Sequence, residues 1–121
     1  MSLFDLISNI IRNASGSGRA SLKDAYLGEK APKGPGVYKI FHNNKLMKVG
    51  KANDGLRKRF SDYYRGVEGG TAALKYITTA NRDEVIVQWR ECPVEKCREL
   101  ETKMHDSAIN SGETLPWSDR R

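Results

Sequence analysis

The sequence lacks the features of a membrane-spanning, secreted or disulfide-stabilised protein. No apolar run approaches the ~20 residues that a membrane-spanning helix requires. No secretory signal is recognisable either, because no basic stretch precedes residues 3–11 and the polar residues Asp5 and Asn9 interrupt them. The only cysteines are Cys92 and Cys97. We therefore expect a cytoplasmic protein in which both cysteines are free thiols.

Internal repeats and low-complexity segments are also missing. The chain has 121 residues, of which 38% are hydrophobic and 30% charged, as is typical of a folded globular protein rather than a disordered one. This length predicts one compact domain. Within it, we assign residues 1–33 to a helical extension with a loop, and residues 34–121 to the main folding unit.

Acidic residues are scarce between Lys33 and Arg65. This stretch holds nine basic residues but only two acidic ones, Asp54 and Asp62, so its net charge is +7. The rest of the chain holds 12 basic and 13 acidic residues, which nearly cancel. Such a local excess is typical of a surface that binds an anionic partner such as a nucleic acid. A charged face that serves only solubility is the alternative, and charge by itself does not separate the two.

Hydrophobic periodicity predicts an α+β fold: a small three-stranded, mainly antiparallel sheet with a β-hairpin, flanked by helices. The expected strands are residues 37–41, 45–49 and 84–90, with the Asn43-Asn44 pair turning the hairpin between the first two. The expected helices are residues 3–11, 21–27 with Ser21 as cap, 56–64 with Asn53 or Asp54 as cap and Gly66 as end, a weaker one at 71–79, and 94–108.

Two glycines of the hairpin and one face of the following helix indicate where chemistry takes place. Gly36 precedes Tyr38 on the first hairpin strand, and Gly50 follows Lys48 on the second, where a missing side chain lets backbone approach a ligand. On the next helix Arg59 and Tyr63 are four residues apart and therefore project from one face. The basic residues at other angles of that helix, Arg57 and Lys58, are expected to contact phosphates from outside.

These residues resemble the GIY-YIG nuclease family, most closely the domain at the N-terminus of the bacterial excision-repair nuclease C subunit. The resemblance covers residues 34–119. It rests on the following motifs: Gly34-Pro35-Gly36-Val37-Tyr38, Val49-Gly50-Lys51-Ala52, Leu56-Arg57-Lys58-Arg59 with Tyr63, and Leu100-Glu101 on the last helix. Two positions depart from the family pattern: Lys48 stands where the family has its second tyrosine, and Asp119 stands at the family's C-terminal asparagine.

The resemblance implies an endonuclease that hydrolyses DNA phosphodiester bonds with one divalent ion, Mg²⁺ or Mn²⁺. Glu101 would bind the ion, Arg59 would hold the pentacoordinate phosphorus, and Tyr38 would position or deprotonate the attacking water. Lys48 and Tyr63 complete the expected catalytic set. The expected nucleic-acid contacts are Lys39, Gly50, Lys51, Arg57 and Lys58. His105, four residues after Glu101, is a further candidate ligand, although a solvent-exposed histidine is the simpler interpretation.

Three functional hypotheses remain open at the level of sequence. The first is the metal-dependent nuclease, acting alone, as a homodimer or with a targeting protein. The second is a nucleic-acid-binding module of the same fold in which Lys48 has impaired catalysis. The third is an interaction domain whose basic face binds a protein. A zinc site is disfavoured, because the Cys92 and Cys97 spacing lacks the second ligand pair that such sites use.

Overall fold

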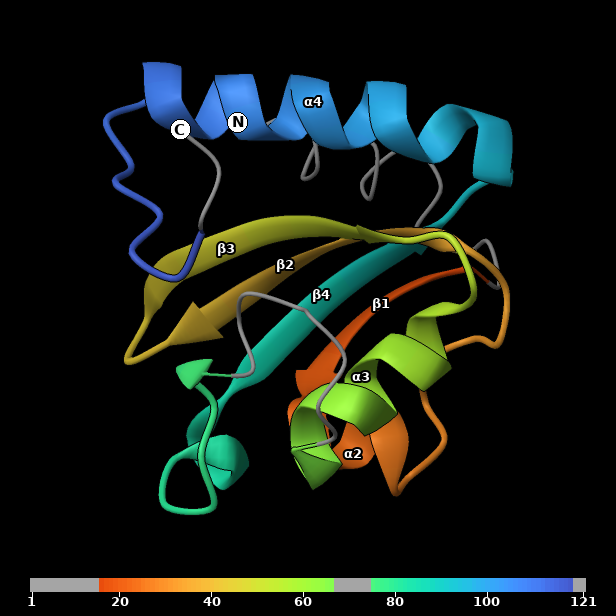
Figure 1. Ribbon diagram of the computed structural model, residues 1–121, viewed down its shortest axis with the longest axis vertical. Coiled ribbons are helices and arrows are strands. Elements are labelled where there is room, and N and C mark those ends of the chain that lie inside the picture. The colour runs from red at the N-terminus through yellow and green to blue at the C-terminus, as the bar shows by residue number, and fades with distance from the viewer. Residues whose placement is uncertain (1–15, 67–74, 119–121) are drawn as a thin grey trace.

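The computed structural model describes residues 16–66 and 75–118, which form a four-stranded antiparallel sheet with helices on both faces (Figure 1). The strands are β1 (Ser17–Ser21), β2 (Gly36–His42), β3 (Lys45–Ala52) and β4 (Ile86–Glu91), in the order β1-β4-β2-β3. The helices are α2 (Leu22–Tyr26), α3 (Leu56–Arg65), α4 (Val94–Asn110) and a short 3₁₀ turn, η2 (Arg82–Glu84). The predicted α+β class is confirmed.

The sheet has one strand more than the sequence predicted. Strand β1 has the sequence Ser-Gly-Arg-Ala-Ser, which carries no apolar alternation and so gives no strand signal of its own. It forms because its backbone pairs with β4, from Ser17 opposite Arg90 to Ser21 opposite Ile86. The expectation of three strands was therefore wrong, since tertiary pairing created a fourth at the edge of the sheet.

The predicted hairpin is confirmed between β2 and β3. Its turn residues Asn43 and Asn44 have φ values of 51° and 64°, which asparagine tolerates better than most residues. The pairing register shifts between Ile40 and Phe41, so a bulge lies near the turn. Both strands are longer than predicted.

The helix predictions are confirmed for α2, α3 and α4, but one cap is wrong. The Ser21 hydroxyl accepts the backbone N–H of Asp24 at 3.0 Å, as expected of an N-cap. The N-cap of helix α3 is instead Gly55, which provides no side-chain hydrogen bond. The loop before β2 satisfies its first amides, because Leu56 N–H and Arg57 N–H donate to the carbonyls of Gly34 and Pro32 at 2.9 and 3.0 Å.

Part of the predicted helical content cannot be compared with the structure. The expected helix at residues 3–11, the first half of the expected helix at 71–79, and Asp119 lie outside the described residues. Residues 75–79 lie within them and are not α-helical. No helix in residues 16–66 and 75–118 is both long and apolar enough to cross a bilayer.

Two hydrophobic layers hold the fold together. The layer between the sheet and helices α2 and α3 is the larger and includes Tyr38, Ile40, Phe60, Tyr63 and Trp89. It also receives Leu22 and Ala25 from α2, so the chain before Gly34 contributes to this core. The layer between the sheet and α4 contains Val37, Val49, Cys97, Met104 and Ala108. Residues that alternate along one strand therefore enter different layers.

Candidate active site

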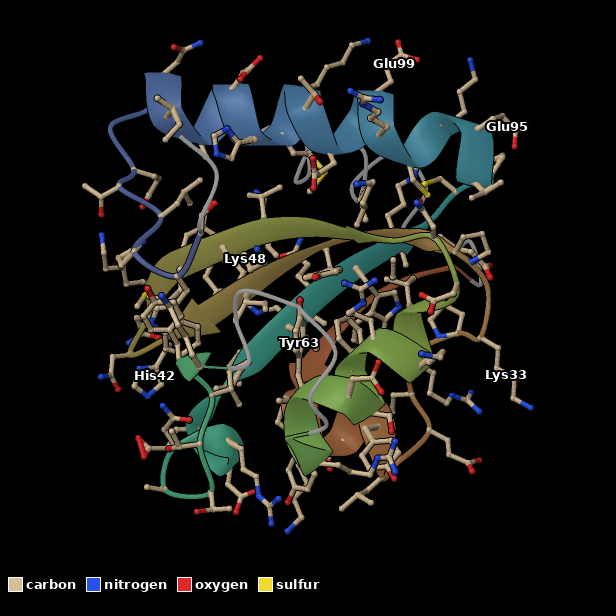
Figure 2. All side chains as sticks on the ribbon, viewed as in Figure 1. Lys33, His42, Lys48, Tyr63, Glu95 and Glu99 are labelled. Carbon is tan, nitrogen blue, oxygen red and sulfur yellow. The ribbon has the colours of Figure 1, made fainter. Side chains whose placement is uncertain are left out.

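The centre of the candidate site is a pair of tyrosine hydroxyls. Tyr38 on β2 and Tyr63 on α3 hydrogen-bond to each other through their hydroxyl oxygens. Their ring centroids are 5.9 Å apart in an edge-to-face arrangement, and each side chain is only 1% exposed. Figure 2 shows Tyr63 reaching from α3 towards the sheet. The structure thus joins two residues that the sequence placed on separate elements.

Gly50 makes this pair possible. It lies opposite Tyr38 in the β2–β3 register, and the Tyr38 ring lies across it. A Cβ at position 50 would be 2.5 Å from both Cζ and Oη of Tyr38, which is closer than atoms can pack. The sequence assigned this glycine to ligand approach, whereas in the structure it makes room for the tyrosine.

Arg59 extends the tyrosine pair towards solvent. Its guanidinium interacts electrostatically with the Tyr63 hydroxyl, because the spacing of four residues on α3 places both side chains on one face. Its Nη2 also lies 3.7 Å from Oδ1 of Asp54, and its side chain is 23% exposed. The sequence suggested Asp54 only as a helix cap, although its spacing of four residues from Lys58 was a signal for the ion pair that these two form at 3.2 Å.

The two phenols differ in how readily they lose a proton. Burial raises the pKa of Tyr38 well above its usual value, and the neighbouring Tyr63 raises it further. Burial also raises the pKa of Tyr63, but the hydrogen bond from Tyr38 and the positive charge of Arg59 oppose this rise. Because the hydrogen bond with Tyr38 and the charge of Arg59 both favour the ionised form of Tyr63, that residue is the better proton acceptor of the pair.

Lys48 lies on the same face of the sheet as the tyrosine pair. It pairs with Ile40 in the register, two residues along β3 from Gly50, and it is half-buried. Figure 2 shows it on β3, near the layer into which Tyr63 points. Its ammonium group adds a positive charge to this face of the sheet.

Glu101 is buried in the other layer. Its side chain is 8% exposed, and Cys97 and Met104, which lie on the same face of α4, pack towards the sheet. Glu95 and Glu99 instead point away from the sheet (Figure 2). The sheet therefore separates the Glu101 carboxylate from the Tyr38 ring. Its charge still acts on Tyr38, where it adds to the rise in pKa that burial and Tyr63 cause.

Glu101 offers one buried carboxylate to a hard divalent cation, but no cluster of further ligands surrounds it in the described residues. Among the described residues no group of three His, Cys, Asp or Glu side chains gathers to form a metal cage. Mg²⁺ commonly binds through one or two carboxylates and completes its shell with water and substrate phosphates, and one buried carboxylate at Glu101 fits that pattern. His105 is not solvent-exposed as expected: its side chain is 12% exposed and its Nδ1 lies 3.9 Å from Asp106.

The predicted nucleic-acid contacts occupy different environments. Lys39 is 6% exposed on the α4 side of the sheet. Arg57 uses its side chain within the fold, because Nε donates to the carbonyl of Ala31 at 2.9 Å and Nη2 to that of Glu29 at 3.1 Å. Lys58 is exposed, and Lys51 is half-buried. Lys33, on the loop before β2, extends into solvent (Figure 2).

Comparison with known proteins adds nothing to this geometry. No family model matches the chain, and neither a curated protein nor a solved structure shows significant similarity to it.

Proposed function

We propose that this protein is a divalent-metal-dependent endonuclease that hydrolyses phosphodiester bonds in DNA. The observation that carries the proposal is the hydrogen-bonded pair of Tyr38 and Tyr63, packed against Gly50 and subject to the positive charge of Arg59. These residues lie within the 33 residues that hold a net charge of +7. A guanidinium, two phenols and a basic surface are the groups that phosphodiester hydrolysis needs for binding phosphate and moving a proton.

Each group has a distinct part in the proposed reaction. The partly exposed Arg59 binds the scissile phosphate and stabilises the negative charge that develops on it. Tyr63, once its own proton has passed to solvent, accepts the proton of the attacking water as a phenolate, and Tyr38 orients Tyr63 through their shared hydrogen bond. Glu101 would hold Mg²⁺ or Mn²⁺, which would supply charge stabilisation for the phosphate and the leaving oxygen. Because Glu101 lies on the α4 side of the sheet, the substrate would have to reach that side as well as Arg59. Lys48 contributes a further cation beside the phosphate.

A nucleic-acid-binding module of the same fold is the second candidate. Two observations favour it: both phenols are 1% exposed, and Glu101 lies on the far side of the sheet from them. Lys48 also stands in place of a tyrosine in the family that the sequence resembles. Cleavage by a Lys48→Tyr variant, together with none by the natural protein on any DNA, would identify this module.

A cleavage assay tests the nuclease proposal. Supercoiled, linear, branched and single-stranded DNA are incubated with Mg²⁺ or Mn²⁺ and the natural protein, and with Arg59→Ala and Glu101→Ala variants. We expect metal-dependent cleavage that both substitutions abolish. Arg65→Ala and Glu99→Ala are matched controls, because they remove the same charges from exposed positions of α3 and α4. Unchanged cleavage in Arg59→Ala and Glu101→Ala would overturn the site assignment.

The proposal includes a cytoplasmic location and DNA as partner. Both described cysteines are free thiols, which a reducing compartment maintains. The substrate surface would be the exposed part of the +7 segment around Arg59 and Lys58. A homodimer or a separate targeting protein would supply any selectivity for particular DNA structures.

A further inference from the structure

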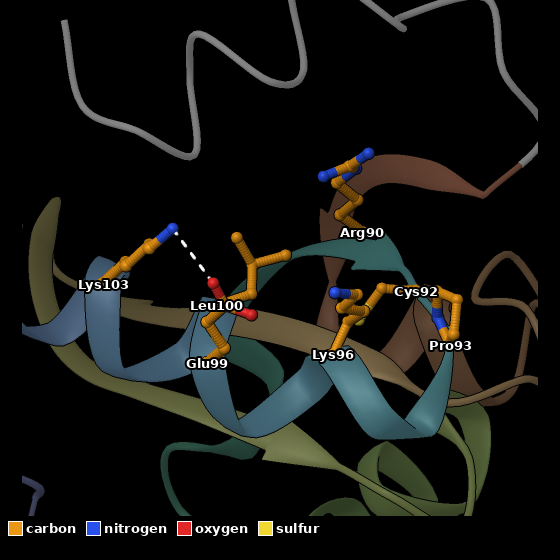
Figure 3. A pocket seen from close by; sticks show the side chains of 7 residues that line it. All are labelled: Arg90, Cys92, Pro93, Lys96, Glu99, Leu100 and Lys103. Carbon is orange, nitrogen blue, oxygen red and sulfur yellow. Dashed lines mark ion pairs between the residues drawn. The ribbon is translucent and has the colours of Figure 1, made fainter.

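A basic pocket opens on the side of the sheet opposite the tyrosine pair, between the end of β4 and helix α4. It has a volume of about 280 Å³ and is lined by Arg90, Cys92, Pro93, Lys96, Glu99, Leu100 and Lys103 (Figure 3). Three of these side chains are cations and one is an anion, the Glu99 carboxylate, which lies 3.2 Å from the Lys103 ammonium. Within the described part of the chain, the buried Nε of Arg90 has no hydrogen-bond partner. The pocket therefore favours an anionic occupant.

Two thiols meet at this pocket. The sulfur atoms of Cys92 and Cys97 are 3.2 Å apart, and both residues are free cysteines. Cys92 lines the pocket and is 9% exposed, whereas Cys97 lies behind it in α4 and is fully buried. A solute in the pocket can thus reach Cys92 first. A disulfide bond is about 2.04 Å long, so a small shift of the two side chains would bring the sulfurs to bonding distance.

We propose that this pocket is a thiol–disulfide exchange site, at which an anionic low-molecular-weight disulfide oxidises Cys92 and Cys97 to an internal disulfide. The proposal is independent of the proposed nuclease function. In this proposal the cations of the pocket bind the carboxylates of the incoming disulfide. Cys97, which is buried behind Cys92, resolves the mixed-disulfide intermediate.

The exchange proceeds in two balanced steps. The thiolate of Cys92 attacks one sulfur of the small disulfide, whose S–S bond breaks and releases one thiolate, leaving a mixed disulfide on Cys92. Cys97 then loses its proton and attacks the Cys92 sulfur, which expels the second small thiolate. Overall, two protein thiols and one small disulfide give one protein disulfide and two small thiols, and no other oxidant is consumed.

The surroundings of Cys92 set the rate of the first step. Burial and the adjacent Cys97 raise the pKa of the Cys92 thiol to about 12, and Glu91 adds to the rise while Arg90 opposes it. The cations Lys96 and Lys103 also face the pocket. Since only the thiolate reacts, exchange should be slow at neutral pH and accelerate by about tenfold per pH unit below that pKa.

Intact mass spectrometry with glutathione disulfide as the probe tests the pair. We expect the full chain to lose two hydrogen masses, the Cys97→Ser variant to keep one glutathione as a stable mixed disulfide, and the Cys92→Ser variant to stay unmodified. Circular dichroism confirms that each variant is folded. Modification of Cys92→Ser at the rate of the natural chain, a stable glutathione adduct on the natural chain, or no reaction at all would overturn the proposal.

The charge of the probe tests the pocket. Glutathione disulfide should react about tenfold faster than the cationic disulfide cystamine, because the pocket attracts the former and repels the latter. Lys96→Glu should reduce this preference at least several-fold. Arg98→Glu is the matched control, since it makes the same change in net charge at an exposed position of α4 that does not line the pocket. Equal rates for the two probes, or equal effects of the two substitutions, would exclude recognition by this pocket.

Discussion

The ring of Tyr38 occupies the space that a side chain at Gly50 would fill on the neighbouring strand. A Cβ at position 50 would lie 2.5 Å from Tyr38 Cζ and Oη and 2.8 Å from Cε2. Three contacts this short cannot be relieved by a small rotation, because the ring also packs edge-on against Phe60 and Tyr63. The position of the Tyr38 hydroxyl, and its bond to Tyr63, therefore depend on the absence of one methyl group.

Gly50→Ala should lower the free energy of unfolding by about 1–3 kcal/mol, the usual cost of overpacking a core. Urea unfolding followed by fluorescence measures this change. In a Tyr38→Leu background the same substitution should cost less, because the ring that it strikes is gone. An equal cost in both backgrounds would show that the strain has another origin.

Stability should fall at alkaline pH because of the tyrosine pair. Folding raises the pKa of both phenols above 10.0, so the unfolded chain releases their protons first as the pH rises. The contribution to stability is complete below about pH 10 and is lost progressively above it. Urea unfolding at a series of alkaline pH values measures the slope. Tyr38→Phe should make the slope shallower, and Tyr26→Phe, which is outside the pair, should leave it unchanged.

Local patterns predicted those parts of the fold that depend on neighbouring residues. The Asn43-Asn44 turn and the end of α3 at Gly66 follow from backbone preferences of single residues, and the structure confirms both. Strand β1 was missed because its sequence is polar and only the partner strand β4 makes it a strand. The start of α3 was misassigned because its first amides bond to carbonyls of a loop more than twenty residues earlier.

The candidate site likewise has features that local spacing predicts and features that depend on how the elements pack together. The shared face of Arg59 and Tyr63 could be predicted, since it depends on helical spacing alone. The bond between Tyr63 and Tyr38 could not, because it depends on how α3 packs on the sheet. The layer that Glu101 enters likewise follows from the topology, which places α4 on the face opposite α3. Periodicity correctly indicated that Glu101 faces the sheet, but it carried no information about which face.

Arg59→Lys should reduce cleavage by about 10²–10³-fold if the proposed function is correct. A lysine retains the charge but cannot bind phosphate oxygens and Tyr63 at the same time, because it lacks the planar fork of the guanidinium. Steady-state cleavage rates at saturating metal measure the effect. Arg65→Lys is the matched control, since Arg65 lies on the same helix and pairs with Asp62 at the exposed surface. Equal losses in the two variants would argue against a special role for Arg59.

Lys48→Met should weaken DNA binding and reduce its dependence on salt. Lys48 lies on the face of β3 that carries Gly50, so a phosphate held by Arg59 would also be near its ammonium group. Removing one phosphate contact lowers the slope of log affinity against log salt concentration by about one. Fluorescence anisotropy with labelled DNA in metal-free buffer measures binding without cleavage. Lys23→Met, on the exposed surface of α2 and outside the +7 segment, should leave both affinity and slope unchanged. A slope that Lys48→Met does not alter would remove Lys48 from the DNA-binding surface, whether or not the protein cleaves DNA.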